Sequence, residues 1–247
     1  MLEVDAVIFD FIGTLTVIEN YPYEGSIEKL FQSLVENGFD VDSTQFNKEY
    51  ERAYYRNRKI RYQRLIEIPN RVWVSEALNK LGHATTSDDS GIKLAVNAFF
   101  EDYLKALKLQ EFAETTLKNC TQKYKVGLVS NFTHATVIYT GLEKLKINAY
   151  FNTVLVSEAF GWRKPSPKIF REALRRLAVK AERTLFVGDT PLEDIQGAKE
   201  VGMKTVFIPS QFKNLDDMQK AAKQPDYIIK NLNEVLNILN SHPTIPQ

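Results

Sequence analysis

The chain has 247 residues, 44% of them hydrophobic and 26% charged, which predicts one large α/β domain or a core with an inserted domain and excludes extensive disorder. Thirty-two basic against 31 acidic residues give a formal net charge of +1, so no global field draws the chain to nucleic acid or to an anionic membrane. The single cysteine, Cys120, excludes an internal disulfide. No apolar stretch approaches the ~20 residues that span a bilayer and no secretory signal pattern opens the chain, so we expect a cytoplasmic protein.

The first predicted element is a buried strand over residues 6–9, whose apolar run AVIF stops at Asp10. Continuous apolar runs are typical of parallel strands that are covered on both faces. Because ligands of open α/β sheets bind at the carboxyl ends of the strands, Asp10 is a candidate nucleophile.

After this strand the pattern becomes helical for about a hundred residues, which predicts an inserted domain. Apolar positions at helical spacing predict four helices, over residues 26–38, 44–66, 69–82 and 92–107. Four helices with short connections form a small bundle. We therefore predict an α/β core from residues 1–16 and 110–247 and a helical insert from residues 17–109, with hinges near 16–23 and 107–112.

Strand signals return in the second half of the chain and alternate with helices. Strands are predicted at 126–129, 154–156, 184–187 and 205–208, a short edge strand at 227–229, and helices at 133–145, 167–177 and 192–201. This alternation predicts a parallel sheet with right-handed crossovers. Residues 242–247 carry two prolines and are expected to form a loose tail.

Polar residues follow several of these strands. Asp10 is followed by Phe11-Ile12-Gly13-Thr14, a later strand ends in Val129-Ser130-Asn131, and Arg163-Lys164-Pro165 comes after the next. The run Gly188-Asp189-Thr190-Pro191-Leu192-Glu193-Asp194 follows the strand at 184–187. Each alone has a plain structural explanation, as a turn, a solvated lysine or a helix cap. In this order the four segments resemble the motifs of the haloacid dehalogenase (HAD) superfamily.

The resemblance implies a fold and a set of roles. The fold would be α/β, with a Rossmann-like parallel-sheet core and an inserted all-helical cap that closes over the strand ends. Asp10 would be the nucleophile, Lys164 would neutralise charge, and Thr14 would orient the loop. Ser130 and Asn131 would bind the substrate anion. Mg²⁺ would be held by Asp10, Asp189, Asp194 and the backbone carbonyl of Ile12.

Ile12 departs from the phosphatases of this superfamily. They usually carry a second aspartate at this position, which protonates the leaving group and then activates water, a role typically worth 10²–10⁴-fold in rate. An isoleucine can do neither. Its side chain therefore limits which leaving groups the chemistry of Asp10 can accept.

A second resemblance, to the L-2-haloacid dehalogenases, lies in the segment 55–62, which includes Tyr55, Arg56 and Tyr62. Those enzymes also lack the second aspartate, because a halide leaves without a proton, and their arginine at the position of Arg56 receives it. Their position matching Asp189 is neutral, however. A helix face with solvated basic side chains explains the same segment equally well.

Three hypotheses follow, and none has nucleic acid or a membrane as partner: two are hydrolases of small molecules, and the third binds a phosphorylated ligand or a protein partner. We favour a Mg²⁺-dependent HAD-type hydrolase of a small phosphorylated compound, because Asp189, Glu193 and Asp194 are retained. A 2-haloacid dehalogenase-like hydrolase is the close alternative. A catalytically weakened binding protein is the third, and the sequence predicts neither the substrate nor the oligomeric state.

Overall fold

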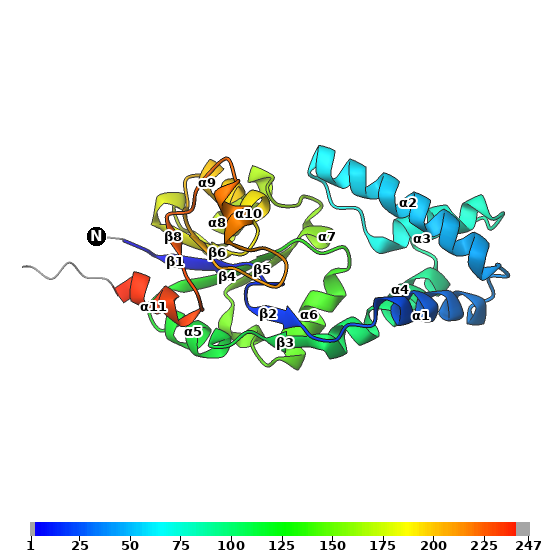
Figure 1. The fold of residues 1–247 in the computed structure, drawn as a ribbon, viewed down its shortest axis with the longest axis horizontal. Helices are drawn as coiled ribbons and strands as arrows, with labels where there is room; N and C mark the ends of the chain where they lie inside the picture. Colours follow the sequence, from blue (N-terminus) through cyan, green and yellow to red (C-terminus); the bar gives the residue numbers. More distant parts are fainter. Residues whose placement is uncertain (1–2, 241–247) are drawn as a thin grey trace, which may run out of the picture.

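A six-stranded parallel sheet forms the centre of the computed structural model, which describes residues 3–240 (Figure 1). In the order in which they lie side by side, its strands are β5 (Thr153–Val156), β4 (Lys125–Ser130), β1 (Ala6–Phe9), β6 (Thr184–Gly188), β7 (Lys204–Phe207) and β8 (Tyr227–Ile228). Every pairing is parallel. The predicted α/β class and parallel sheet are confirmed. The tail predicted at 242–247 lies outside the described residues.

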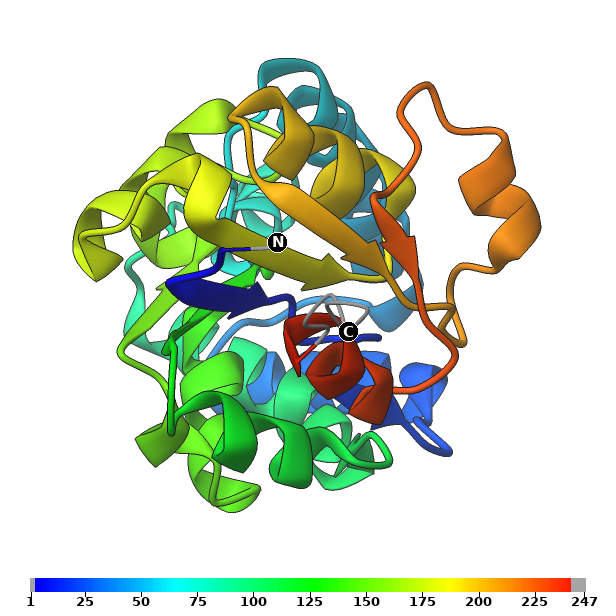
Figure 2. The ribbon, with the colours of Figure 1, turned by 90° about the vertical axis from the view of Figure 1, so that its left-hand side faces the viewer.

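Helices cover both faces of this sheet (Figure 2). One face carries α5 (Ala113–Cys120), α6 (Ala135–Lys144) and α11 (Asn233–Asn240), and the other carries α8 (Pro167–Leu177) and α9 (Gly197–Glu200). Alternate residues of β1 point to opposite faces, so Val7 packs with the first group and Ile8 with the second. This double coverage explains the unbroken apolar run of β1.

Four helices form a second body at one end of the molecule (Figure 1). They are α1 (Tyr23–Glu36), α2 (Ser43–Arg64), α3 (Asn70–Lys80) and α4 (Ser90–Ala106). Helix α1 packs mainly on α4, and α2 mainly on α3, around their own core, which includes Phe46 and Trp73. The expected four helices are present, although α1 begins before Ser26, which is buried rather than a cap.

A pair of short strands that the sequence did not predict lies between the two bodies. Strand β2 (Thr16–Ile18) pairs antiparallel with β3 (Leu107–Leu109), inside the two stretches where we expected hinges. The side chain of Gln211 bonds both the amide and the carbonyl of Ile18, at 2.9 and 3.1 Å. The chain therefore passes between the bodies through paired strands.

The second departure from the predicted elements is at residues 192–201. The chain forms a π-helical turn, Pro191–Gln196, followed by the short helix α9 instead of one continuous helix. The sequence also did not predict α5 and α11, nor the remaining elements, which are α7 (Ser157–Phe160), α10 (Leu215–Gln219) and the 3₁₀ turns Asn148–Tyr150 and Ala181–Arg183. π-Helical turns are frequent at functional sites, and this one carries Asp194.

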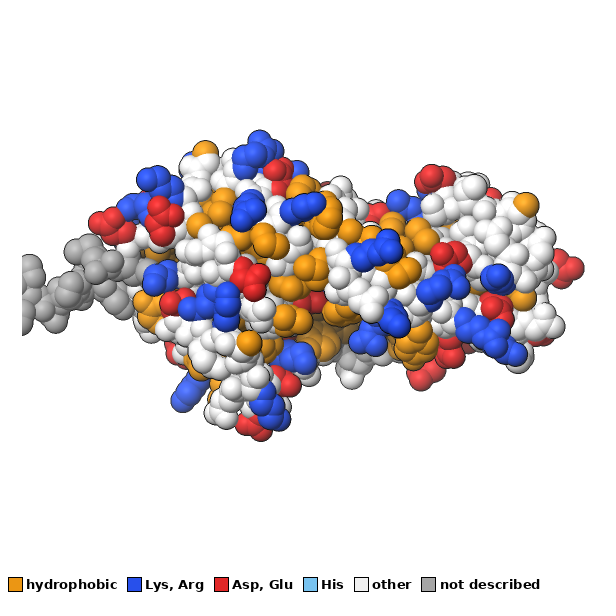
Figure 3. All heavy atoms as spheres, turned by 90° about the horizontal axis from the view of Figure 1, so that it is seen from above, with side chains coloured by type: hydrophobic (Ala, Val, Ile, Leu, Met, Phe, Trp, Pro, Cys, Tyr) orange, Lys and Arg blue, Asp and Glu red, His pale blue; other side chains and the backbone are white. Residues whose placement is uncertain are grey.

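The surface carries both signs of charge. Figure 3 shows lysine and arginine side chains interspersed with acidic ones over one face of the molecule, in keeping with the formal charge of +1. Among residues 3–240, none of the helices combines the length and the apolar composition that a membrane crossing needs.

Candidate active site

Polar side chains converge at the carboxyl ends of three adjacent strands. Asp10 follows β1, Ser130 ends β4, and Asp189 follows β6, and β1 lies between the other two strands in the sheet. Because parallel strands all end at the same edge, residues far apart in sequence meet there. The structure thus brings together the residues that the motifs singled out on these strands.

Lys164 links the carboxylates of this site. Its side chain is buried, and Nζ donates hydrogen bonds to Asp10 Oδ1 and Asp194 Oδ1, both at 2.6 Å. Asp194 in turn accepts a bond from the Thr190 amide at 2.9 Å, so the π-helical turn holds its carboxylate. A buried lysine between two carboxylates keeps its charge because each neighbour favours the ammonium form.

Asn131 positions Lys164. Its side-chain oxygen accepts from the Lys164 amide at 2.8 Å, and its Nδ2 donates to the Lys164 carbonyl at 2.9 Å and to Glu193 Oε2 at 2.8 Å. The sequence suggested contact of Asn131 with substrate. In the structure its amide group is occupied by the lysine loop and by Glu193.

Three carboxylates are placed to hold a metal ion. Asp10, Asp189 and Asp194 are buried, and each offers an oxygen within 4.8 Å of the others. Asp10 Oδ2 is buried and has no hydrogen-bond partner within residues 3–240. Asp189 Oδ2 accepts from Ser210 Oγ at 2.6 Å, a contact that no sequence signal indicated. Three hard oxygen donors with one orphaned atom fit Mg²⁺.

The pKa values of the clustered carboxyl groups also favour a bound cation. Burial raises the pKa of Asp10 to about 8; Lys164 opposes this shift, and the carboxylates of Asp194 and Asp189 add to it. Burial also raises the pKa of Asp189 to about 6, again with Asp194 acting in the same direction. The site therefore holds more negative charge than one lysine neutralises, which a divalent cation would relieve.

The loop after Asp10 approaches Asp189 closely. Gly13 has φ +92°, and a Cβ added there would lie 2.8 Å from Asp189 Cγ and closer still to Oδ2. Thr16 Oγ1 donates to the Phe11 carbonyl at 2.9 Å and closes the turn. Thr14, expected to orient the loop, is buried with a hydroxyl that has no partner within the described residues. Glycine is thus required where the loop passes the carboxylate.

A cavity of about 790 Å³ opens in front of Asp10, at the junction of the two bodies. Ile12 and Ser130 line it, and Ser130 Oγ is buried with no hydrogen-bond partner among residues 3–240. The other lining residues come from both bodies: Ile18, Tyr21, Tyr54, Arg61, Tyr62, Tyr103, Asn131, Phe132, Arg163, Lys164, Thr190, Glu193, Gln211 and Phe212. The size is that of a small-molecule site.

The structure does not bring Arg56 to this cavity. Its side chain is half exposed and pairs with Glu76 at 2.6 Å. Arg61, also on α2, lines the cavity instead, with Nε bonded to Glu67 Oε1 at 2.5 Å. Arg163 lines it too, and its guanidinium lies 4.2 Å from the ring centre of Tyr62. Both arginines stand within segments that the sequence singled out, but spacing alone did not distinguish them.

The connection between α2 and α3 docks on the core beside this cavity. The Glu67 amide donates to the Gly161 carbonyl at 2.9 Å, and the Arg163 amide donates to the Leu65 carbonyl at 3.1 Å. Ser157 Oγ donates to Glu67 Oε2 at 2.6 Å. These bonds join the helical body to the loop that carries Lys164.

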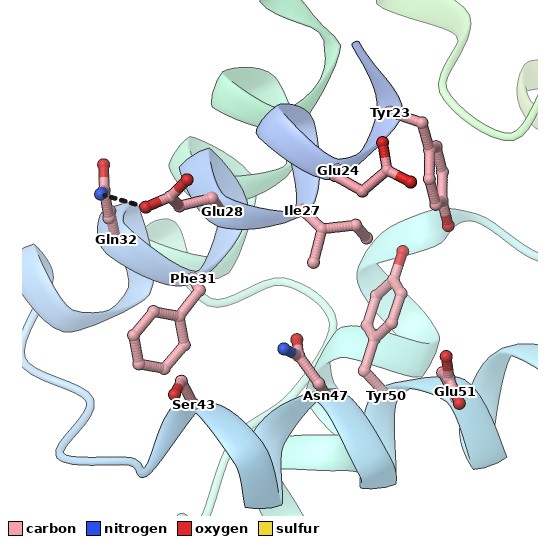
Figure 4. A pocket seen from close by; sticks show the side chains of 10 residues that line it. All are labelled: Tyr23, Glu24, Ile27, Glu28, Phe31, Gln32, Ser43, Asn47, Tyr50 and Glu51. Atoms are coloured by element: carbon pink, nitrogen blue, oxygen red, sulfur yellow. Dashed lines mark hydrogen bonds between the residues drawn. The ribbon is translucent and has the colours of Figure 1, made fainter.

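A second cavity, of about 620 Å³, lies between α1 and α2 (Figure 4). Side chains of both helices, among them Ile27, Phe31, Tyr50 and Glu51, point into it. The strand-end groups described above do not line it. The strand-end groups therefore belong to the cavity at the junction.

A parallel sheet with helices on both faces and a carboxylate–lysine cluster at its strand ends defines a hydrolase of the HAD class. The chain belongs to the haloacid dehalogenase-like hydrolases, whose family model matches residues 4–202. It is 34% identical over 172 residues to haloacid dehalogenase-like hydrolase domain-containing protein 3 of Mus musculus, covering 68% of this chain and 67% of that protein.

Two further relatives are named phosphatases. The chain is 28% identical over 245 residues to ribulose-1,5-bisphosphate 5-phosphatase of Halopiger xanaduensis, covering 95% of this chain and 99% of that protein. It is 34% identical over 127 residues to glyceraldehyde 3-phosphate phosphatase of Pyrococcus furiosus. That match covers 51% of this chain and only 52% of the relative.

Solved structures share the fold. A 2-haloacid dehalogenase from Pseudomonas syringae superposes with a TM-score of 0.65 at 24% identity, covering 96% of this chain and 98% of that one. A HAD phosphatase from Thermococcus onnurineus gives 0.57 at 23% identity, with the same coverage of 96% and 98%. Both branches of the superfamily thus have this architecture, and the likeness does not distinguish between them.

Proposed function

We propose that this chain is a Mg²⁺-dependent phosphohydrolase of small phosphorylated compounds, with Asp10 as the nucleophile. The observation that carries the proposal is the cluster of Asp10, Asp189 and Asp194 around Lys164, with oxygens of the three carboxylates within 4.8 Å of one another. Metal-independent dehalogenases of the superfamily have a neutral residue where Asp189 stands. The relatives named phosphatases support the same reading.

The chemistry follows from the two oxygens of Asp10. Oδ1 is bonded to Lys164, whereas Oδ2 has no partner within residues 3–240. One of the two oxygens would attack phosphorus while the other would face the metal ion. Attack on phosphorus forms a phosphoryl–aspartate bond and breaks the bond to the leaving group. Water then attacks the same phosphorus, releases phosphate and restores the carboxylate.

Neighbouring groups would bind and orient the phosphate. Ser130 Oγ, buried and without a partner among the described residues, donates to a phosphate oxygen. Lys164 balances the charge of Asp10, and Asn131 keeps the lysine in place. Asp10, Asp189 and Asp194 would hold Mg²⁺, with the Ile12 carbonyl as a further ligand, and the ion supplies neutralising charge for the transferred group.

The helical body, residues 17–109, would act as a cap over the strand ends. The paired strands β2 and β3 would connect this cap to the core. Tyr54 and Arg61 of α2 line the cavity from the cap side. Closure over the strand ends would exclude water from the phosphoryl-transfer step. Contacts from the cap then select the substrate.

The test compares two substrates with and without Mg²⁺. We expect Mg²⁺-dependent phosphate release from acetyl phosphate and no chloride release from 2-chloropropionate. Asp10→Asn should lower phosphate release by more than about 10³-fold, since it removes the nucleophile. Asp189→Asn should retain activity only at raised Mg²⁺ concentration.

The dehalogenase alternative is favoured by one observation, the apolar Ile12 beside Asp10 in the cavity. Chloride release without metal, abolished by Asp10→Asn, would establish that reaction in place of ours. Unchanged phosphate release by the Asp10→Asn variant would contradict the assignment of Asp10 as the nucleophile. Turnover of neither substrate across a broad panel would favour a binding protein.

A further inference from the structure

Six aromatic rings line the cavity that Asp10 faces. They belong to Tyr21, Tyr54, Tyr62, Tyr103, Phe132 and Phe212. Three of the rings form a connected wall, since Tyr103 lies edge-on to Tyr21 with centroids 5.2 Å apart and lies 5.4 Å from Phe132. Such a wall favours a planar aromatic ligand, which packs against ring faces and edges.

The same cavity offers no positioned acid for a leaving group. Among residues 3–240, the only carboxyl side chains that line it are those of Asp10 and Glu193. Both oxygens of Glu193 are occupied, Oε1 by Arg163 at 2.7 Å and Oε2 by Asn131 at 2.8 Å. No histidine or cysteine of the described residues lines the cavity. No other carboxyl of this part of the chain therefore replaces the usual proton donor.

Lys164, Tyr103 and Tyr21, which also line the cavity, are poor proton donors. Lys164 is engaged by two carboxylates, at 2.6 Å each. Burial raises the pKa of Tyr103 and of Tyr21 above the usual value for tyrosine, which weakens both hydroxyls as acids at neutral pH. Apart from Asp10, the described residues that line the cavity therefore offer no unoccupied carboxyl, histidine or cysteine as a proton donor, which favours a leaving group that departs as a stable anion.

We propose that the site is selective for aryl phosphate monoesters, a substrate class that rests on the proposed phosphohydrolase function. A phenol has a pKa of about 10, against about 16 for water and comparable values for simple alcohols, so a phenolate departs unprotonated where an alkoxide does not. The aromatic wall then holds the ring of the same leaving group.

The reaction balances without an enzymic acid. An oxygen of Asp10 forms a bond to phosphorus while the bond from phosphorus to the phenolic oxygen breaks, and the phenolate leaves with the electron pair. The phenolate takes its proton from solvent. Water then attacks phosphorus, loses a proton to solvent, and releases inorganic phosphate from Asp10.

The experiment compares four phosphates with the full chain and Mg²⁺. Phenyl phosphate has an aromatic ring and a weakly basic leaving group, and benzyl phosphate has an aromatic ring with an alkoxide leaving group. Cyclohexyl phosphate has an alkoxide leaving group and no aromatic ring. Acetyl phosphate has a weakly basic leaving group and no aromatic ring. We expect kcat/KM for phenyl phosphate to exceed that for benzyl and cyclohexyl phosphate by about 10²–10⁴-fold, the worth of a general acid. We expect KM for acetyl phosphate to be higher than for phenyl phosphate.

Two sets of variants separate the effect of the missing proton donor from the effect of contact with the aromatic ring of the substrate. Ile12→Asp should raise kcat/KM, which reports the step in which the leaving group departs, on benzyl and cyclohexyl phosphate by about 10²-fold or more, and should change kcat/KM on phenyl phosphate little, because it restores the acid. Tyr54→Leu should raise KM for phenyl phosphate more than for acetyl phosphate, whereas Tyr54→Phe, which keeps the ring, should not. Tyr55→Leu is the matched control, since Tyr55 is 60% exposed and does not line the cavity.

The outcomes distinguish this inference from the proposed function. Equal kcat/KM for cyclohexyl and phenyl phosphate, or an equal effect of Tyr54→Leu on KM for phenyl phosphate and for acetyl phosphate, overturns the aryl assignment. Mg²⁺-dependent turnover of acetyl phosphate without turnover of phenyl phosphate also overturns it and leaves the phosphohydrolase intact. Turnover of none of the four overturns both.

Discussion

Ile12 lies two residues after Asp10, the proposed nucleophile, and lines the cavity. This one residue affects both halves of the proposed reaction. In the first half it withholds a proton from the leaving group. In the second half it withholds a base from the water that must attack phospho-Asp10, so the second half is slow for any substrate.

We therefore expect the covalent intermediate to accumulate when the leaving group is a good one. Rapid mixing with p-nitrophenyl phosphate and Mg²⁺ should give a burst of nitrophenolate that approaches the concentration of active sites, followed by a slow steady state. Ile12→Asp should abolish the burst and raise the steady-state rate by about 10²–10⁴-fold. Ile12→Val, which stays apolar, should keep it. Linear product formation from the first turnover in the wild-type chain would contradict the assignment.

Some site residues could be predicted from the sequence and others could not. Asp10, Lys164, Asp189 and Asp194 meet as their motif order predicts, because each follows a strand or loop at the same sheet edge. The cap arginine could not be chosen in this way. Arg56 and Arg61 share a helix, and only the folded structure shows that Arg61 lines the cavity while Arg56 pairs with Glu76.

At the scale of elements, the loop after β1 depends on a glycine. Gly13 has a positive φ and passes Asp189 closely, whereas Gly38 has almost the same φ, +90°, and a Cβ added there would meet nothing within 4 Å. The pair separates backbone strain from steric contact. An alanine at either position meets the same backbone penalty, and only at position 13 does it also meet a carboxylate.

Gly38→Ala should cost about 1–2 kcal/mol in free energy of unfolding, from strain alone. Gly13→Ala should cost more, and it should also weaken Mg²⁺ binding because its Cβ would displace the Asp189 carboxylate. Urea unfolding measures the first effect, and calorimetric titration with Mg²⁺ measures the second. Unchanged Mg²⁺ affinity in Gly13→Ala would show that the loop moves aside instead.

The connection between α2 and α3 holds the helical body to the core through Glu67. This carboxylate is buried and bonded to Arg61 and Ser157. Glu67→Ala should lower the free energy of unfolding by about 3–5 kcal/mol, because it leaves a buried arginine unpaired. Glu49→Ala, which removes an exposed pair with Arg52 on the same helix, should cost less than about 1 kcal/mol. Similar costs for the two variants would mean that Glu67 does not hold the junction.

The segment before β8 is attached to β7 by Asp226. Burial opposes ionisation, but hydrogen bonds from Lys199 and Thr205 more than offset it and hold the pKa of Asp226 below its usual 3.8. A carboxyl group with a lowered pKa contributes stability above its unfolded pKa, and this stability is lost as the pH falls through the folded value. The difference in unfolding free energy between wild type and Asp226→Asn should therefore be constant from about pH 7 to pH 5 and smaller near pH 3. A difference that grows toward low pH would contradict this sign.

At the scale of the whole molecule, two bodies with separate cores enclose one cavity. The sheet body has an apolar cluster on each face of its sheet, and the helical body has its own cluster, which includes Trp73. Residues of both bodies line the cavity. The carboxylate cluster lies in the sheet body alone. Metal binding is therefore expected to stabilise that body whatever the position of the helices.

Mg²⁺ at 100 times its dissociation constant should stabilise the protein by about 2.7 kcal/mol, because the ion binds the folded state. For a chain of this size the thermal midpoint should rise by about 5–10 °C. Asp189→Asn should lose most of the rise. Asp217→Asn, which alters a carboxylate outside the cluster, should keep it, and an equal rise in both variants would place the ion elsewhere.

The fold class, the strands that carry the site and the four motifs at their ends could all be predicted from the sequence. Each depends on a local sequence pattern: a continuous apolar run, apolar residues at helical spacing, or polar residues directly after a strand. Other features became evident only in the folded chain. Pairing of β2 with β3 joins residues about ninety positions apart, the Asn131 amide finds its partners in another loop, and Arg61 rather than Arg56 reaches the cavity. Such contacts depend on how whole elements pack, and they leave no pattern in neighbouring residues from which they could be predicted.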